Sequence, residues 1–580
     1  MRCAVTTVTT VITVAAGAFA PGHLGELTRI VPFELADAVL EEEGGRERRV
    51  RLLPSRCGLY FLLAMCLFPE RSYLGVWGKL TVGLRALRVP VPSGRALRDL
   101  RRRVGTAPVR RLFEVLAGPL GQPRTPGIMF GGYRTVSFDG CKSLKVPDTA
   151  ANRAWLGKRS LAQGEAAYPA LLLMTLVETG TRALLGAVFG SQSSGEAVWA
   201  RKLLPLLDAT MLLLLDRGFD DGPFLAQVAA RKAQFLVRLS SIRRPRVLRY
   251  LPDGSCLTVL GGVKVRVITA RVTVTCHDGT SYGDAYRLAT TLLDHRRHPA
   301  GALVSLYHER WEHEVTYLAL RHTLLKGRVL RSGDPAGIEQ EMWALLALYQ
   351  ALRTAVTDAV QSVPGLDPDR AGWQAAVETA RDLVTAAWNI TDPEGADLPG
   401  DIGRAALASL HGPRRPRVCA RKVKSPLSRW RAHPPGKPST TKKITSITTD
   451  IDPRHYKPPK PRLTLIDKLR QAAERGEPVD HLLKRLTSRH CQYSYKDNRS
   501  DQCDNASTDR GTRPGRLGSP TCRPRHRHGC TLSATPTTCS IGVDGVADRC
   551  DRVDGVGDRW HRVDGVGDGF GGVGGLVCYR

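Results

Sequence analysis

The segment Met211-Leu212-Leu213-Leu214-Leu215-Asp216 places five apolar residues in a row directly before a carboxylate. An apolar run this short predicts a central strand that is buried on both faces. Residues 134–138 alternate between apolar and polar side chains, as a strand does, and they end at a second carboxylate, Asp139. We therefore expect two strands at the centre of the fold, each ending in an aspartate.

The surrounding residues predict an α/β domain, because segments with the period of strands are interleaved with segments with the period of helices. Further strands are expected over residues 142–146, 183–189, 235–239, short stretches of 247–275, and 286–293. Helices are expected over residues 194–207, 223–232, 301–325, 338–360 and 373–388. The predicted domain spans residues 126–395 and contains a β-rich insertion at about residues 235–282.

The composition limits the class of protein. The chain has 580 residues, a formal net charge of +30 and 42% hydrophobic residues, which excludes a wholly disordered or collagen-like chain. The longest apolar run, residues 59–68, is well short of the ~20 residues that a membrane helix needs, and this excludes an integral membrane protein. The excess of positive charge favours a polyanionic partner, most simply nucleic acid.

Two regions are predicted on the N-terminal side of the α/β domain. Residues 1–23 are expected to be a leader, because the apolar part at 5–20 is rich in threonine and follows a single arginine, unlike a secretory signal. Residues 24–125 are expected to form a helical DNA-binding domain, since apolar residues recur every three to four positions. Its basic cluster is a candidate for phosphate contacts, and the alternative is a solvated helix face. The cluster consists of Arg98, Arg101, Arg102 and Arg103.

Residues 396–580 are predicted to be a basic, low-complexity and disordered tail. Proline, lysine, arginine, serine and threonine dominate from Gly412 onward, and Val-Asp-Gly-Val recurs at Val543, Val553 and Val563. Two origins stay open for the part after about residue 480. It is either a basic arm that binds DNA without sequence preference or the product of a shifted reading frame.

A third carboxylate lies on the long predicted helix at 301–325. At ~100° per residue, four side chains of this helix fall within an arc of about 60°. They are Tyr307, Arg310, Glu314 and Arg321. Carboxylates that follow buried strands suit magnesium or manganese, and cations in line with a carboxylate suit phosphate groups near a metal. The alternatives are ordinary turn residues at the aspartates and a solvated, salt-bridged helix face.

These residues also carry a resemblance to a known family. Tyr307, Arg310 and Glu314 fit the signature Tyr-x2-Arg-x3-Glu-x6-Lys, with Arg321 where the lysine stands. Segments similar to other regions of the family are Phe138-Asp139-Gly140 with Pro147-Asp148-Thr149, Asp216-Arg217-Gly218-Phe219, and Leu24-Gly25-Glu26-Leu27-Thr28. On these motifs, residues 15–395 resemble a DDE transposase of the insertion-sequence-four family, which is found in bacterial insertion elements.

The resemblance implies an RNase H-like catalytic domain with a β-rich insertion, preceded by an all-helical domain and followed by the disordered tail. The residues that would act in catalysis and hold two Mg²⁺ or Mn²⁺ ions are Asp139, Asp216 and Glu314. The residues that would hold phosphates near the cleavage point are Tyr307, Arg310 and Arg321.

The resemblance further implies a function in DNA transposition. Such an enzyme binds the terminal inverted repeats of its element, cleaves the phosphodiester bonds at the ends and transfers the strands into target DNA. The implied partners are double-stranded DNA and a second copy of the chain in a homodimer, with no membrane, and the implied location is the cytoplasm, at the nucleoid. Two other interpretations stay open: a catalytically inactive, sequence-specific DNA-binding relic of a transposase, and a basic nucleic-acid scaffold.

Overall fold

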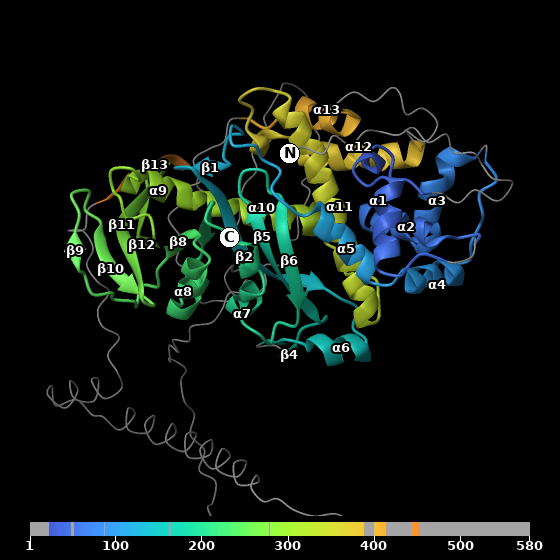
Figure 1. Cartoon of the computed structure of the whole chain (residues 1–580), viewed down its shortest axis with the longest axis horizontal. Coiled ribbons are helices and arrows are strands. Elements are labelled where there is room, and N and C mark those ends of the chain that lie inside the picture. The colour runs from blue at the N-terminus through green and yellow to red at the C-terminus, as the bar shows by residue number, and fades with distance from the viewer. Residues whose placement is uncertain are drawn as a thin grey trace, which may run out of the picture. The chain divides into compact units, whose positions relative to one another are not determined.

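A mixed sheet of 11 strands lies at the centre of the structure (Figure 1). The computed structural model describes residues 22–47, 51–85, 87–161, 164–277, 279–387, 400–412 and 444–451, all of them within the unit formed by residues 1–457. Residues 1–21 of the predicted leader and most of the predicted tail, residues 413–443 and 452–580, lie outside the described residues. The predicted α/β class is confirmed.

One half of the sheet contains the two aspartates. Its strands follow the spatial order β6, β5, β2, β7, β8, in which β2, β7 and β8 run parallel, whereas β5 is antiparallel to both of its neighbours. Their bounds are β2 (Tyr133–Lys145), β5 (Ala170–Glu178), β6 (Leu184–Gly190), β7 (Met211–Leu215) and β8 (Gln234–Arg238). A short strand, β1 (Met129–Phe130), also pairs with β2.

The other half extends the sheet beyond β8 through antiparallel pairs. Its order is β12, β11, β10, β9, and β13 pairs with β11 next to the stretch that pairs with β10. The bounds are β9 (Arg249–Tyr250), β10 (Cys256–Leu260), β11 (Val263–Cys276), β12 (Ser281–Thr290) and β13 (Ile444–Asp450). Residues 234–238, where the insertion was expected to begin, instead belong to the first half, because β8 is parallel to β7. A separate hairpin joins β3 (Ser160–Leu161) and β4 (Gly164–Glu165).

Different helices cover the two faces of the sheet. In β7, Leu213 and Leu215 pack in one core cluster with α7 (Glu196–Arg201) and α8 (Gly222–Ala230). Leu212 and Leu214 pack in another cluster with α9 (Ala300–Tyr307). This alternation follows from the two-residue period of a strand, and it puts Asp216 on the face toward α9.

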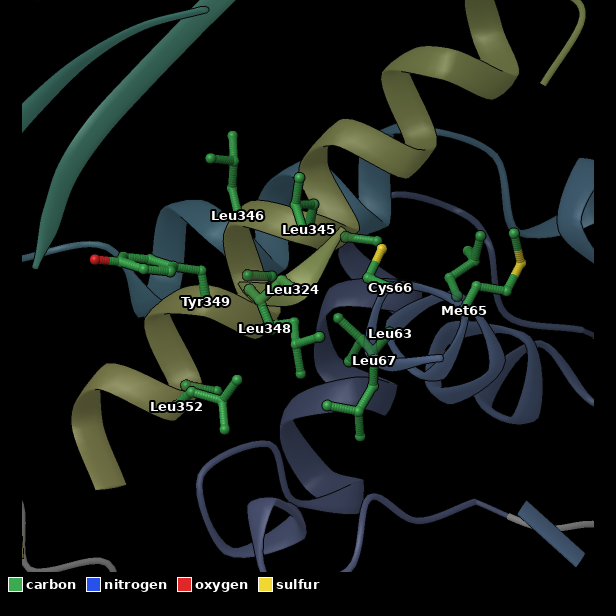
Figure 2. Packing of buried hydrophobic residues seen from close by; sticks show 14 of the residues in the cluster. Leu63, Met65, Cys66, Leu67, Leu324, Leu345, Leu346, Leu348, Tyr349 and Leu352 are labelled. Atoms are coloured by element: carbon green, nitrogen blue, oxygen red, sulfur yellow. The ribbon is translucent and has the colours of Figure 1, made fainter. Parts of the chain in front are cut away.

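The remaining helices form an apolar unit beside the sheet (Figure 1). Its members are α1 (Phe33–Glu42), α2 (Ser55–Leu67), α3 (Tyr73–Thr81), α4 (Gly94–Val104), α5 (Ala107–Leu116), α11 (Pro335–Gln361), α12 (Trp373–Ala386) and α13 (Gly400–Ala408). Helix α2 is apolar almost all round and is buried accordingly. Figure 2 shows Leu63 and Leu67 of α2 close to Leu348 of α11. The N-terminal helices therefore share one core with helices that follow residues 139–321 in sequence.

The long helix predicted at residues 301–325 is present, but it is not a uniform α-helix. It consists of α9, a 3-10 turn (His308–Arg310), α10 (Trp311–Leu318) and a π-helical turn (Ala319–Leu324). Such breaks change the angle between successive side chains, so a uniform 100° step cannot place every residue of the segment.

Three other predictions differ from the structure. Residues 142–146 are no separate strand, because β2 continues through a bulge between Cys141 and Leu144. Strand β5 was missed because eight of its nine residues are buried, which removes the alternation that identifies a half-exposed strand. Part of the predicted tail is ordered, since α13 packs in the helical core and β13 joins the sheet.

Within the described residues, no helix combines the length and the apolar character that crossing a lipid bilayer requires.

Candidate active site

Two parallel strands bring Asp139 and Asp216 to the same end of the sheet. The register pairs Ser137 of β2 with Leu214 of β7, and each aspartate lies two residues further along its strand. Ser137 bonds to His313 of α10 and Leu214 packs against α9, so both aspartates face these helices. Burial, and after it the negative charge of Asp139, raise the pKa of Asp216.

The backbone holds one oxygen of each aspartate. Oδ1 of Asp139 accepts a hydrogen bond from the amide of Gly140 at 2.9 Å. Oδ1 of Asp216 accepts one from the amide of Gly218 at 2.6 Å, which caps the short 3-10 turn Arg217–Phe219. Asp216 is therefore fixed by the turn that follows β7. Asp139 instead lies inside β2, which runs on to Lys145, so the expectation that the first strand ends at Asp139 is wrong.

Arg310 lies among the predicted acids. Its Nη1 donates to Oδ2 of Asp139 at 3.0 Å, and its side chain is 15% exposed. Burial alone would lower the pKa of Arg310, but the charges of Asp139, Tyr307, Asp216 and Glu314 outweigh burial and raise it. The three predicted carboxylates thus act electrostatically on one guanidinium.

Tyr307, predicted to hold phosphate, is buried next to two cations. Burial raises its pKa, and the charges of Arg310, Asp216 and Arg238 act on it as well. Arg238 is the last residue of β8, the strand parallel to β7. Burial, Arg238 and Arg310 also lower the pKa of His308 to about 4. Sequence analysis did not identify Arg238, because a cation at the end of a strand indicates a site only when the neighbouring strands are known.

Glu314 and Arg321 lie on the next part of the same helical segment. Burial raises the pKa of the Cys141 thiol in β2, the charge of Arg321 lowers it, and the charge of Glu314 raises it. Both predicted side chains therefore act electrostatically on a residue of β2 that lies two positions after Asp139. Arg321 does so from the π-helical turn, which sequence analysis did not anticipate.

In the described part of the chain, the three acids whose oxygens all lie within 4.8 Å of one another are not the predicted set. They are Glu309, Glu312 and Asp369. Two of them are paired already, because the buried guanidinium of Arg182 lies 2.6 Å from Glu312 Oε2 and 2.7 Å from Asp369 Oδ1. Arg182 thus offsets part of the negative charge of this group, as an arginine in a buried ion pair does.

A fourth carboxylate, Glu196, lies beside the two aspartates and was not predicted. It begins α7, and its Oε1 lies 2.9 Å from Nζ of Lys142. A Cβ atom at Gly140 would come within 2.8 Å of Glu196 Cγ, so the glycine after Asp139 makes room for this side chain. Burial raises the pKa of Glu196, Lys142 lowers it, and Asp139 and Asp216 raise it. Its only sequence signal is an acid at a helix start, which is too common to identify a site.

Buried hydrogen bonds join α10 to β2 and β5 directly behind Asp139. Nδ1 of His313 lies 2.8 Å from Ser137 Oγ, and Nε2 lies 2.7 Å from Thr175 Oγ1. The hydroxyl of Tyr317 lies 3.0 Å from Thr175 Oγ1 and donates to the main-chain oxygen of Asp139 at 2.6 Å. Sequence analysis singled out neither His313 nor Tyr317.

The basic cluster of α4 is divided between surface and core. Arg98 and Arg102 are exposed, and Arg102 pairs with Asp99 at 3.2 Å. The expectation that Arg101 contacts DNA phosphate is wrong, because its side chain is 6% exposed and forms an ion pair with Glu341 of α11. The partly buried Arg103 pairs with Glu47 at 3.1 Å. Arg101 therefore joins α4 to α11, and Arg103 joins α4 to the loop that contains Glu47.

The site combines oxygen donors at neighbouring strand ends with cations directed at the same place. Carboxylates in this arrangement bind hard divalent cations, and arginines beside them bind phosphate. An α/β domain with such a site belongs to the class of enzymes that transfer phosphoryl groups of nucleic acids with the help of metal ions.

Comparison with known proteins agrees with this class. The N-terminal family of insertion element 4 transposases matches residues 21–114, and the transposase DDE domain family matches residues 132–350. The chain belongs to the DDE transposases of the insertion-sequence-four family, enzymes of DNA transposition that bind DNA and use a divalent metal to cleave and transfer its strands.

Two similar proteins come from Escherichia coli strain K12. The transposase InsG for insertion sequence element IS4 is 27% identical over 345 residues, which cover 58% of this chain and 77% of InsG. The putative transposase InsZ is 30% identical over 125 residues, which cover 21% of this chain and 42% of InsZ. A solved piggyBac transposase synaptic complex with hairpin DNA matches at 9% identity and a TM-score of 0.33, covering 70% of this chain and 87% of that chain. A TM-score this low does not establish a common fold.

Proposed function

We propose that this chain catalyses the transposition of an insertion element at an active site in which three carboxylates hold two Mg²⁺ or Mn²⁺ ions. The carboxylates are Asp139, Asp216 and Glu314. The observation that carries the proposal is the parallel pairing of β2 with β7, which brings Asp139 and Asp216 to neighbouring strands, with Arg310 hydrogen-bonded to Asp139 at 3.0 Å. The charges of Asp139, Asp216 and Glu314 all raise the pKa of Arg310, which supports placing Glu314 near the two aspartates.

The fold of the catalytic domain supports an RNase H-like assignment. In such a domain, three strands paired antiparallel are followed by two that run parallel to the first. Here β2, β5 and β6 form the antiparallel part, and β7 and β8 are added on the other side of β2 in parallel. We assign residues 126–395 to this domain and residues 24–125 to a helical DNA-binding domain.

The side chains at the strand ends fit a divalent cation. Asp139 and Asp216 offer only oxygen atoms, the donors that Mg²⁺ and Mn²⁺ prefer. The charge of Asp139 contributes to the raised pKa of Asp216, so each carboxylate would gain from a cation that both can bind. Two such ions would activate the attacking water or 3′ hydroxyl and stabilise the leaving oxygen of the phosphodiester.

Tyr307, Arg310 and Arg321 would bind the phosphates next to the cleaved bond. Burial raises the pKa of Tyr307, so its hydroxyl stays protonated at neutral pH and can donate a hydrogen bond. Arg310 keeps its charge, because the surrounding acids raise its pKa. Arg238 adds a further positive charge at the end of β8.

The proposed DNA substrates are the terminal inverted repeats of the element and a target duplex, and the proposed assembly is a homodimer that pairs the two ends. The exposed Arg98 and Arg102 of α4 are the members of the basic cluster that could reach phosphates. We place the protein in the cytoplasm, at the nucleoid, because that is where such DNA lies.

The experiment that tests this function is cleavage of a DNA fragment carrying an element end in the presence of Mg²⁺. Separate Asp139→Asn, Asp216→Asn and Glu314→Gln variants should lower the cleavage rate by ~10³-fold or more, as expected for groups that act as a unit. Binding of the same fragment should persist, measured by gel shift in the absence of metal.

Glu309→Gln is the matched control, because Glu309 lies on the same helical segment but in the other acidic group. It should retain cleavage within a few-fold of the unaltered protein. Loss of cleavage in Glu309→Gln together with normal cleavage in Asp139→Asn would move the metal site to the other group. Tight binding without cleavage by the unaltered protein would support the inactive relic.

A further inference from the structure

We propose that Tyr317 and His313 are positioning residues that fix the main chain of Asp139 against helix α10 through an ordered chain of hydrogen bonds. The chain sets Asp139 and Glu314 in the relation that metal binding requires. This inference rests on the proposed function, since it assigns Asp139 and Glu314 to the same centre.

The chain is closed to water. Ser137, Thr175 and His313 are each 0% exposed, and Tyr317 is 3% exposed. A buried polar group without a partner is costly, so each of these side chains must find its hydrogen bonds among the others. The four contacts between the side chains and the carbonyl of Asp139 span 2.6–3.0 Å.

With a neutral imidazole, only one order of protons satisfies all four contacts together. The Tyr317 hydroxyl uses its single proton on the carbonyl of Asp139, so it must accept from Thr175. The proton of Thr175 is then used, and Thr175 must itself accept from Nε2–H of His313. Nδ1 of His313 has no proton in a neutral ring of this form, and it accepts from Ser137. The geometry therefore assigns the neutral Nε2–H tautomer to His313.

The chain holds both elements that carry the carboxylates. On α10, His313 and Tyr317 stand one residue before and three residues after Glu314, so the helix is anchored on both sides of it. On β2, the hydrogen bonds of the chain reach Ser137 and Asp139. The pairing of β2 with β7 ends at Ser137, and the bulge in its pairing with β5 begins after Cys141. Tyr317 thus supplies a hydrogen bond to β2 at the point where the regular ladder changes.

Tyr317→Phe tests the inference, because it removes one hydroxyl and leaves the ring. We expect the affinity of the DNA-free protein for Mn²⁺, measured by electron paramagnetic resonance, to fall by about 10–100-fold, as for other groups that orient metal ligands. The rate constant for cleavage at saturating DNA should fall by a similar factor, with little change in DNA affinity.

Tyr60→Phe is the matched control. Tyr60 is equally buried and donates to the carbonyl of Val31 at 2.7 Å, but it lies in the helical unit. Both variants should lose a similar amount of thermal stability, and only Tyr317→Phe should lose Mn²⁺ affinity. Unchanged Mn²⁺ binding and cleavage in Tyr317→Phe, or equal losses in Tyr60→Phe, would overturn the inference.

His313 provides a second test. His313→Gln keeps an N–H donor toward Thr175 and should retain more Mn²⁺ affinity than His313→Leu, which has none. In the unaltered protein, ¹⁵N NMR of the imidazole should report the Nε2–H tautomer, and the Nδ1–H tautomer would contradict the proton order. If the unaltered protein neither binds Mn²⁺ nor cleaves DNA, the proposed function fails and this inference with it. If the unaltered protein does both, and Tyr317→Phe changes neither Mn²⁺ binding nor cleavage, only this inference fails.

Discussion

Individual buried arginines perform two kinds of task in this chain. Arg310 lies among the carboxylates at the strand ends, where its charge can serve a phosphate. Arg182 pairs with Glu312 and Asp369 in the core, and its backbone adopts a φ of +61°, which is uncommon for a residue with a side chain. The residue type is the same, and only the surroundings decide the task.

Arg182→Met should destabilise the protein by about 3–5 kcal/mol, because it leaves two buried carboxylates without their cation. Denaturant-induced unfolding measures this loss. Arg46→Met is the control, since Arg46 and Glu41 are an exposed pair and should contribute less than about 1 kcal/mol. Equal effects of the two substitutions would show that the ion pairs around Arg182 do not stabilise the core.

The sequence contained more information about the arginines than the prediction used. Leu97 and Leu100 mark the buried face of α4, and Arg101 lies four residues after Leu97 on that same face. The helical periodicity alone therefore puts Arg101 on the buried face of α4 and Arg98 on the exposed face. The partners of Arg101 on α11 lie some 240 residues away, and no local pattern could identify them.

At the scale of elements, helix α7 and strand β2 meet at Gly140. Gly140→Ala should displace Glu196, because the new Cβ would lie 2.8 Å from its Cγ and 3.0 Å from its Oε1. We expect a loss of about 1–3 kcal/mol in unfolding free energy, typical of overpacking, and slower DNA cleavage.

For Gly78→Ala we expect the opposite effect on the unfolding free energy, although the chemical change is the same. Gly78 lies inside α3 with no neighbouring atom within 4 Å of the added carbon, so alanine should stabilise the helix by about 0.4–1 kcal/mol. Thermal unfolding of both variants checks the pair. A neutral Gly140→Ala variant would indicate that Glu196 moves aside freely.

Some of the elements could not be predicted from patterns in the sequence. The run Met211–Leu215 was predicted as a strand because it is short, fully apolar and ends at an acid, whereas β5 is almost as completely buried and was not recognised. Periodicity reports exposure on one face, so strands buried on both faces carry little of it. The 3-10 and π-helical turns that flank α10 also carry no periodic signal that a local rule could use.

At the scale of the whole molecule, all described helices and strands lie before residue 452. A chain that ends at Lys457 keeps every described element and serves as the reference. A chain that ends at Gly412 should aggregate more, because it lacks β13 and exposes the edge of β11 at residues 271–276. Light scattering compares the two chains, and equal scattering would show that β13 does not protect this edge.

The α/β class followed from the sequence, because segments with the period of strands are interleaved with segments with the period of helices. The long-range arrangement did not follow from it. The pairing of β13 with β11 and the packing of α2 against α11 depend on contacts between distant segments that no periodicity encodes.

The late position of β13 has a consequence for synthesis. Thr445 bonds to the carbonyl of Thr275, a residue 170 positions earlier. At the usual pace of about 5–20 residues per second, a ribosome needs roughly 10–30 s to make the chain between them. Throughout that interval the edge of β11 in the nascent chain is not yet covered by β13. Nascent chains on neighbouring ribosomes of the same mRNA could then pair with one another through this edge.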